Sequence, residues 1–275
     1  MPCSIGVIGL GRMAQAIVVP LIERGDFEPH QILGVVKHQE SLRRIQEHLP
    51  RGIQVFTSDD PDSMEVWKAP VKLLAIKPQQ LGSIEPTANK LKPEDFVDKP
   101  LLISLLAGVR LKRLMEVFRG HSCVRAVPNA PALVGAGLTG LSLENGLTRS
   151  DQLLVEKIFN PISEIVELPE DQLDAFLALT SSGPAYIALI VEALADGAVA
   201  AGLPRLLANQ LACRTLFGTS LLLQEKELHP GQLKDMVASP GGTTINALRH
   251  LEKAGLRSAL MEAVVAAAER SRELA

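Results

Sequence analysis

The stretch of sequence that decides the fold is Ile5-Gly6-Val7-Ile8-Gly9-Leu10-Gly11-Arg12-Met13-Ala14. Its first four residues form a short run typical of a buried strand, and helical spacing follows from Met13 to Arg24. Gly9 permits a tight turn after the strand, Gly11 leaves the backbone open to close approach, and Ala14 lets the helix pack on the strand. The stretch therefore predicts a strand, a glycine turn and a helix in immediate succession.

The same alternation of apolar runs and helical patterns continues to about residue 168. The expected strands are Ile5–Ile8, Ile32–Val36, Val71–Ile76, Leu101–Leu105 and Cys123–Val127, and two further runs, Leu138–Leu143 and Ile165–Leu168, extend the sheet. The expected helices are Met13–Arg24, Ser41–Leu49, Leu111–Phe118 and Thr148–Phe159. Strands separated by helices predict a parallel sheet covered on both faces. We expect an α/β fold with an N-terminal Rossmann-type NAD(P)-binding domain, residues 1–168.

After Pro169 only helical patterns remain. They are Asp171–Leu179, Pro184–Ala201, Pro204–Gln224, Gln232–Val237, Thr243–Lys253 and Leu256–Glu273. Ala188–Ala201 carries small apolar residues on nearly every face, so we expect this helix to be buried. The 107 residues from 169 to 275 are too few to provide an interior that covers it. A partner subunit resolves the conflict. We expect residues 169–275 to form an all-helical C-terminal dimerisation domain that also borders the active site.

Composition excludes several classes of function. The 275 residues carry a net charge of −3 and only 3% aromatics, which supports neither a basic nucleic-acid-binding face nor a base-stacking platform. The longest apolar stretch, Ala185–Leu203, is interrupted by Glu192 and Asp196, so we expect no membrane span.

The cysteines predict neither disulfides nor a metal site. Cys3, Cys123 and Cys213 are far apart and odd in number, and there is no cluster of cysteine and histidine. Because the first strand begins almost at the N-terminus, we expect no targeting peptide. Both observations predict a cytoplasmic protein with reduced thiols.

The glycine turn predicts a dinucleotide site, because a pyrophosphate sits well on free N–H groups at a helix N-terminus. NAD-binding versions place an acid at the end of the second strand. Here that strand ends in Lys37 and His38, and Arg43 and Arg44 follow. Cations suit a 2′-phosphate, so the sequence favours NADPH, with NADH as a second candidate. The alternative for Arg43 and Arg44 is that they are solvated helix charges.

Five further motifs complete the pattern. They are Ala75–Gln79 (AIKPQ), Ser104–Gly108 (SLLAG), Arg125–Pro131 (RAVPNAP), Ser181–Tyr186 (SSGPAY) and Ser239–Thr244 (SPGGTT). In this order and over essentially the whole chain, they resemble the pyrroline-5-carboxylate reductases. The resemblance implies reduction of 1-pyrroline-5-carboxylate to L-proline with NAD(P)H by a homodimer or ring of dimers.

The resemblance also implies roles for individual residues. The implied cofactor-binding residues are Gly9, Leu10, Gly11, Arg12, Met13, Lys37, His38, Ile76, Lys77, Pro78, Ala107 and Gly108. The implied substrate-binding residues are Glu170, Ser182, Ser239, Gly242, Thr243 and Thr244, with Thr244 as the catalytic residue. Two positions depart from the family pattern. Ser181 stands where a glycine is usual, which questions the backbone path of that loop, and Arg12 stands where Asn or Gln is common, which affects a peripheral cofactor contact.

Imine reduction requires little acid–base chemistry from the protein, because the nicotinamide supplies the hydride, which is the difficult step. The N–H groups of Ser239–Thr244 predict a carboxylate cradle, and the Thr244 hydroxyl can bond the ring nitrogen. The alternative for Thr243 is that it caps the following helix. The alternative functions are another NADPH-dependent imine or hydroxyacid reductase, with Lys77 as the only candidate base, or a non-catalytic NADPH-binding oligomer.

Overall fold

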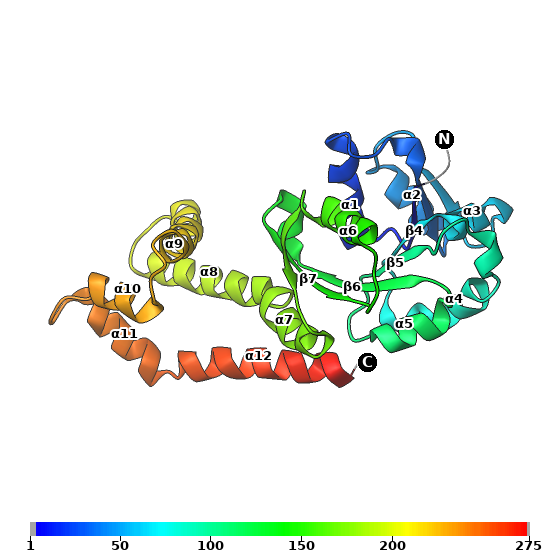
Figure 1. Ribbon diagram of the computed structural model, residues 1–275. Coiled ribbons are helices and arrows are strands. Elements are labelled where there is room, and N and C mark those ends of the chain that lie inside the picture. The colour runs from blue at the N-terminus through cyan, green and yellow to red at the C-terminus, as the bar shows by residue number, and fades with distance from the viewer. Residues whose placement is uncertain (1–3, 274–275) are drawn as a thin grey trace. The chain divides into compact units, whose positions relative to one another are not determined.

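The computed structural model describes residues 4–273 (Figure 1). By its internal contacts the chain divides into two compact units. The first unit comprises the residues up to Ser181 together with those from Ala268 onward, and the second comprises Ser182–Ala267. The predicted division at residue 168 stays a prediction about domains, and each unit is described below by itself.

The first unit is built on an eight-stranded sheet of order β3-β2-β1-β4-β5-β6-β7-β8. The strands are β1 (Ile5–Ile8), β2 (Ile32–Val36), β3 (Gln54–Thr57), β4 (Val71–Leu74), β5 (Leu101–Ser104), β6 (Ser122–Pro128), β7 (Gly137–Leu143) and β8 (Ser163–Glu167). The order 3-2-1-4-5-6 is that of a Rossmann fold, which confirms the predicted class. Its reversal point lies between β1 and β4.

One strand pairing differs from the expected parallel sheet. β7 runs antiparallel to β6, whereas every other neighbouring pair is parallel. Only eight residues, including the short 3-10 turn Ala130–Val134, separate the two strands. That is too short for the crossover a parallel pair requires.

One strand and two α-helices were not predicted from the sequence. β3 lies at the sheet edge, where only Val55 is buried, so its residues form no apolar run. The helices α3 (Met64–Lys68) and α4 (Leu81–Ala88) are short, and Pro86 lies inside α4. Helices of five and eight residues span only about one to two turns, which is too short for the helical spacing of apolar residues to be recognised in the sequence.

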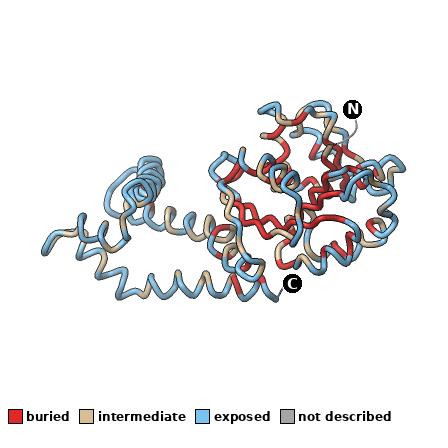
Figure 2. The backbone as a smooth tube through the Cα atoms, in the orientation of Figure 1, coloured by how far each residue is buried: buried red, intermediate tan, exposed pale blue. Residues whose placement is uncertain are grey.

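Helices cover both faces of this sheet. α1 (Arg12–Glu23) and α6 (Arg149–Phe159) contribute to one buried apolar cluster, together with Ile45 of α2 (Gln39–Gln46). α3, α4 and α5 (Leu111–Val117) contribute to the other. Most of the buried chain in Figure 2 lies in this unit, which also contains α7 (Leu173–Thr180).

The second unit consists of helices in the described residues, as predicted. They are α8 (Gly183–Ala200), α9 (Arg205–Glu225), α10 (Pro230–Val237), α11 (Thr243–Lys253) and the greater part of α12 (Leu256–Glu273). Its buried core is a small cluster of Ala195, Ala208 and Ala212. Large apolar side chains remain outside it, including Leu206 at 80% and Phe217 at 63% exposure. Figure 2 shows most of this unit as exposed.

One helical run among the described residues is long and apolar enough to cross a membrane by length and composition alone. It covers Glu170–Ala200 and includes α7 and α8. Such a run is weak evidence for a membrane, because interior and subunit-contact helices of soluble proteins have the same composition. The sequence-based expectation, which considered only Ala185–Leu203, overlooked this longer run.

Candidate active site

A cavity of about 910 Å³ lies at the carboxyl ends of β1, β2 and β4 in the first unit. That volume falls within the range of cofactor pockets. The predicted cofactor residues that line it are Gly9, Leu10, Gly11, Arg12, Lys37, His38, Ile76 and Lys77. Four others, Met13, Pro78, Ala107 and Gly108, are not among its lining residues. Their contacts with cofactor remain predictions.

The glycine turn has the geometry that a pyrophosphate requires. Gly9 has φ +90°, and a Cβ there would lie 2.8 Å from the Ala75 carbonyl oxygen. Gly11 has an ordinary φ of −70°, but a Cβ there would meet no protein atom within 4 Å. Gly11 is also the N-cap of α1, and no side chain caps the helix. The first N–H groups of α1 are therefore available to an anion beside an open space.

Cations and hydroxyls line the cavity beyond β2. The exposed Lys37 and His38 are joined by Arg44, Ser41 and Ser58. Arg43 is exposed and is not among the lining residues, which agrees with the alternative that it is a solvated charge. The acid that lines this region, Asp60, accepts a hydrogen bond from the Asp62 N–H at 2.9 Å. The cavity therefore offers a 2′-phosphate the cations Lys37 and Arg44, the His38 ring and the hydroxyl of Ser41.

Sequence reasoning missed several of these lining residues, namely Ser41, His48, Ser58, Trp67 and Lys90. Ser58 directly follows β3, and its hydroxyl donates to the Lys37 carbonyl oxygen at 3.5 Å. Because β3 was not predicted, its carboxyl end gave no signal. Trp67, the only tryptophan of the chain, is 4% exposed and lines the cavity from α3.

Glu170 has contacts inside the first unit. Its Oε1 accepts from the Leu111 backbone N–H at 2.6 Å and from Arg125 Nη1 at 2.9 Å. Arg125 is almost fully buried, and Glu170 is partly exposed. Its predicted contact with substrate remains a prediction.

The Ser239–Gly242 segment of the second unit forms a tight turn before α11. Gly242 donates its N–H to the Ser239 carbonyl oxygen at 3.0 Å. Pro240 stands at the second position and Gly241, with φ +68°, at the third, as in a type II turn. A Cβ at Gly242 would overlap Ser239 Oγ and lie 3.1 Å from the Ser239 carbonyl oxygen, so a larger residue there requires at least that the Ser239 side chain rotates.

Gly242 is the N-cap of α11, and no side chain caps this helix. The alternative that Thr243 caps it is therefore wrong, because Thr243 is the first helical residue. The first N–H groups of α11 have no acceptors within the helix. They can bind a carboxylate, and the hydroxyls of Thr243 and Thr244 lie in the same turn of the helix.

The departure at Ser181 needs no unusual backbone. Ser181 has φ −90°, so glycine is not required, and its hydroxyl donates to the Pro128 carbonyl oxygen at 3.3 Å. The neighbouring Asn129 donates its side-chain amide to the Thr180 carbonyl oxygen at 3.0 Å. The end of α7 is thus tied to the end of β6, and Ser182 follows as the N-cap of α8.

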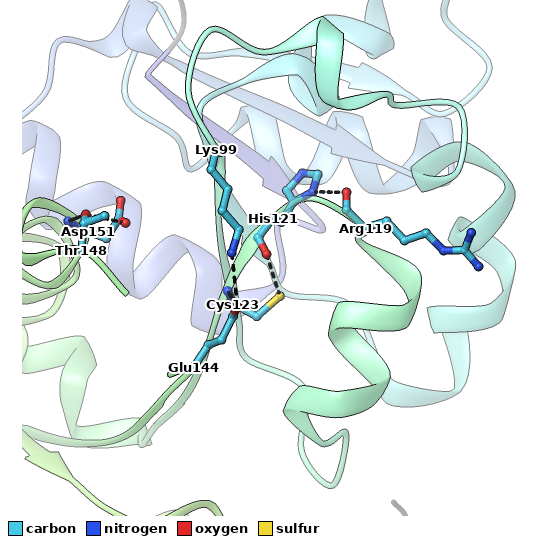
Figure 3. A network of polar contacts seen from close by, with 7 residues as sticks. All are labelled: Lys99, Arg119, His121, Cys123, Glu144, Thr148 and Asp151. Carbon is cyan, nitrogen blue, oxygen red and sulfur yellow. Dashed lines mark hydrogen bonds and ion pairs between the residues drawn. The ribbon is translucent and has the colours of Figure 1, made fainter. Parts of the chain in front are cut away.

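The described cysteines show no sign of catalysis. Figure 3 shows Cys123 among polar groups, where its backbone N–H donates to Glu144 and Glu144 also bonds Lys99. Burial raises the pKa of the Cys123 thiol to about 12, so the thiol stays protonated. Cys213 is exposed and free, whereas Cys3 lies outside the described residues. Within residues 4–273, no cluster of three or more metal-binding side chains occurs.

Comparison with known proteins agrees with this geometry. Residues 4–108 match a family model described as NADP oxidoreductase coenzyme F420-dependent, and residues 170–274 match one described as pyrroline-5-carboxylate reductase dimerisation. The chain is 45% identical to the pyrroline-5-carboxylate reductase of Synechocystis sp. over 276 residues, which is 100% of this chain and 99% of that protein. The chain belongs to the pyrroline-5-carboxylate reductase family. The resemblance inferred from the motifs is confirmed.

Solved structures of the family share the whole fold. A pyrroline-5-carboxylate reductase from Coxiella burnetii is 34% identical, with a TM-score of 0.82, and the match covers 100% of this chain and 99% of that one. The Plasmodium falciparum pyrroline carboxylate reductase, solved with NADP bound, is 27% identical, with a TM-score of 0.83 and coverage of 99% and 98%. The family's dimerisation model matches the half of the chain whose helices leave large apolar side chains exposed.

Proposed function

We propose that this protein reduces 1-pyrroline-5-carboxylate to L-proline with NADPH, the last step of proline biosynthesis. The observation that carries the proposal is full-length 45% identity to a pyrroline-5-carboxylate reductase. The glycine-lined cavity in the first unit and the SPGGTT turn in the second support it. A cytoplasmic location and assembly into a homodimer or a ring of dimers belong to the same proposal.

The residues present fit NADPH. The open space beside Gly11 and the free N–H groups of α1 suit the pyrophosphate, and Lys37, His38 and Arg44 suit the 2′-phosphate. The reduced nicotinamide supplies the hydride. Ile76 and Lys77, which follow β4, would line its side of the cavity.

The substrate has two polar groups that the protein has to bind, a carboxylate and a ring nitrogen. Its carboxylate suits the free N–H groups at the start of α11, and its ring nitrogen suits the hydroxyl of Thr244. The hydride adds to the carbon of the protonated imine, whose nitrogen already carries one proton, so the product is the neutral secondary amine and no further proton is needed. A neutral hydroxyl orients that nitrogen without competing for the proton, so we assign Thr244 the catalytic contact.

An assay of the reverse reaction, in which NADP⁺ is reduced, distinguishes the proposed function from the two alternatives. Purified protein with proline and NADP⁺ at high pH should generate NADPH, whereas a 3-hydroxy acid should not. Reduction of NADP⁺ by the hydroxy acid alone would favour the alternative reductase with Lys77 as base. No reduction with either substrate, together with tight NADPH binding, would favour the non-catalytic oligomer.

We expect the protein to be a dimer or a larger assembly at low micromolar concentration. α8 and α9 expose large apolar residues such as Leu189 (66%) and Leu206 (80%), and burying each such side chain stabilises by about 1.5–3 kcal/mol. Light scattering measures the mass directly. A folded, stable species near 29.6 kDa would contradict the expectation.

Thr244→Val should reduce kcat/KM for the imine acid by roughly fivefold to a hundredfold, because it removes one hydrogen bond to a nitrogen that carries charge. NADPH affinity should change little. Thr215→Val is the matched control, since the Thr215 hydroxyl donates to the Leu211 carbonyl oxygen of its own helix at 2.8 Å. Full activity of Thr244→Val would remove the hydroxyl from the mechanism.

A further inference from the structure

The carboxylate of Glu170 joins two elements that lie far from it in sequence. Oε1 accepts the N–H of Leu111, 59 residues earlier, and the Nη1 of Arg125, 45 residues earlier. Leu111 is the first residue of α5, and its N-cap, Arg110, supplies no side-chain hydrogen bond. Glu170 therefore satisfies a helix N-terminus that the local sequence leaves uncapped.

Arg125 places this contact beside the end of β5. Its register partner on the neighbouring strand is Ser104, the last residue of β5. The Arg125 side chain is 4% exposed, and its Nε has no hydrogen-bond partner among the described residues. A buried guanidinium is costly unless it is paired, so the contact with Glu170 is a strong constraint at this point.

The segment between these contacts is the loop 105–110, held at both ends. At its start the Leu105 N–H donates to the Leu74 carbonyl oxygen at 2.8 Å, and Ser104 Oγ accepts from the Leu106 N–H at 3.3 Å. At its far end Leu111 bonds Glu170. Gly108 in the middle has φ +75°, a conformation suited to glycine.

The strand order indicates what this loop faces. A dinucleotide lies across the reversal point between β1 and β4, with its two halves over opposite sides. The cations after β2 favour the phosphorylated adenosine half on that side. The nicotinamide half is then left for the ends of β4 and β5, and the loop 105–110 directly follows β5.

We propose that Glu170 is a positioning residue for hydride transfer, which fixes the loop 105–110 against the nicotinamide through Arg125 and the Leu111 N–H. The inference rests on the proposed function. It differs from the role that the family resemblance implies for Glu170, a direct contact with substrate. In the described structure the Oε1 of this carboxylate is already held by two groups of the first unit.

The test separates binding from positioning. Glu170→Gln removes the charge that pairs with Arg125 but keeps an acceptor of the same shape. We expect kcat to fall roughly tenfold to a hundredfold, as for a small misplacement of a reacting group, while the Kd for NADPH stays nearly unchanged. Asp171→Asn, an exposed neighbour that loses the same charge, is the control and should keep full activity.

The spectroscopic readout uses Trp67, the only tryptophan of the chain, which lines the cavity. In the complex with NADPH and no substrate, Trp67 is excited and transfers energy to the reduced nicotinamide. The wavelength and intensity of the nicotinamide emission then report the surroundings of that ring. Glu170→Gln should shift that emission toward that of free NADPH. Because this measurement needs no turnover, it tests the positioning role even if the protein proves not to reduce the imine acid.

Arg125→Met completes the test. It should lower kcat and shift the emission as Glu170→Gln does, and the double variant should be no worse than either single one, because both act through one contact. If Glu170→Gln does not fold, Glu170→Asp, with a shorter reach, should give an intermediate loss. An unchanged emission, with a raised KM for the imine acid in the Glu170 variant alone, would overturn the proposal in favour of direct substrate contact.

Discussion

Gly11→Ala should leave the protein folded and lower its NADPH affinity by roughly a hundredfold or more. The added methyl group meets no protein atom within 4 Å, and Gly11 has φ −70°, which alanine also adopts. Loss of glycine at an N-cap and the reduced entropy of the unfolded chain oppose each other, so stability should change by less than about 1 kcal/mol. The methyl group fills the space we assign to the pyrophosphate. Losing two charge-assisted bonds there weakens binding by about 3 kcal/mol or more.

Gly9→Ala is the matched comparison, and thermal unfolding with NADPH titration measures both variants. A methyl group at Gly9 requires φ near +90° and approaches the Ala75 carbonyl oxygen, so this variant should be destabilised even without cofactor. If Gly11→Ala binds NADPH as well as the parent chain, no pyrophosphate lies on this turn.

Lys37→Glu should weaken NADPH binding by roughly a hundredfold to a thousandfold and leave NADH binding within a few-fold. The substitution turns attraction of a doubly charged phosphate into repulsion, and each unit-charge contact at 4 Å is worth about 1–4 kcal/mol near a surface. Because Lys37 is exposed, the loss should shrink as salt is added. Separate titrations with the two nicotinamides measure the effect.

Arg43→Glu is the control for this prediction. Arg43 carries the same charge six residues further on, is exposed and does not line the cavity, so its reversal should affect the two cofactors alike and weakly. Equal losses of NADPH and NADH affinity in Lys37→Glu would remove Lys37 from the 2′-phosphate site.

The sequence predicted the centre of the sheet because its strands are buried on both faces. β1 and β2 are buried throughout and read as apolar runs between helical patterns. β3 was missed because only Val55 is buried in it, and Ser58 was missed with it. The edge of a sheet carries little hydrophobic signal, and here the edge contributes to the candidate cofactor site.

Contacts between distant residues lay beyond sequence reasoning. The pairing of Glu170 with Arg125 and the Leu111 N–H depends on the tertiary fold, and nothing in the spacing of these residues indicates it. The turn before α11 was predictable, because Pro240 and Gly241 have the backbone preferences of a type II turn. The N-cap of α11 was not predictable, because Gly242 occupies this position although threonine, which follows it at Thr243, is a common N-cap residue.

The most direct test of the account is product analysis in the forward reaction. Purified protein is given racemic 1-pyrroline-5-carboxylate and NADPH, and both NADPH consumption and proline are measured. We expect one L-proline for each NADPH oxidised, with a lower kcat/KM for NADH. Oxidation without proline, or no oxidation by a folded protein that binds NADPH, would contradict it.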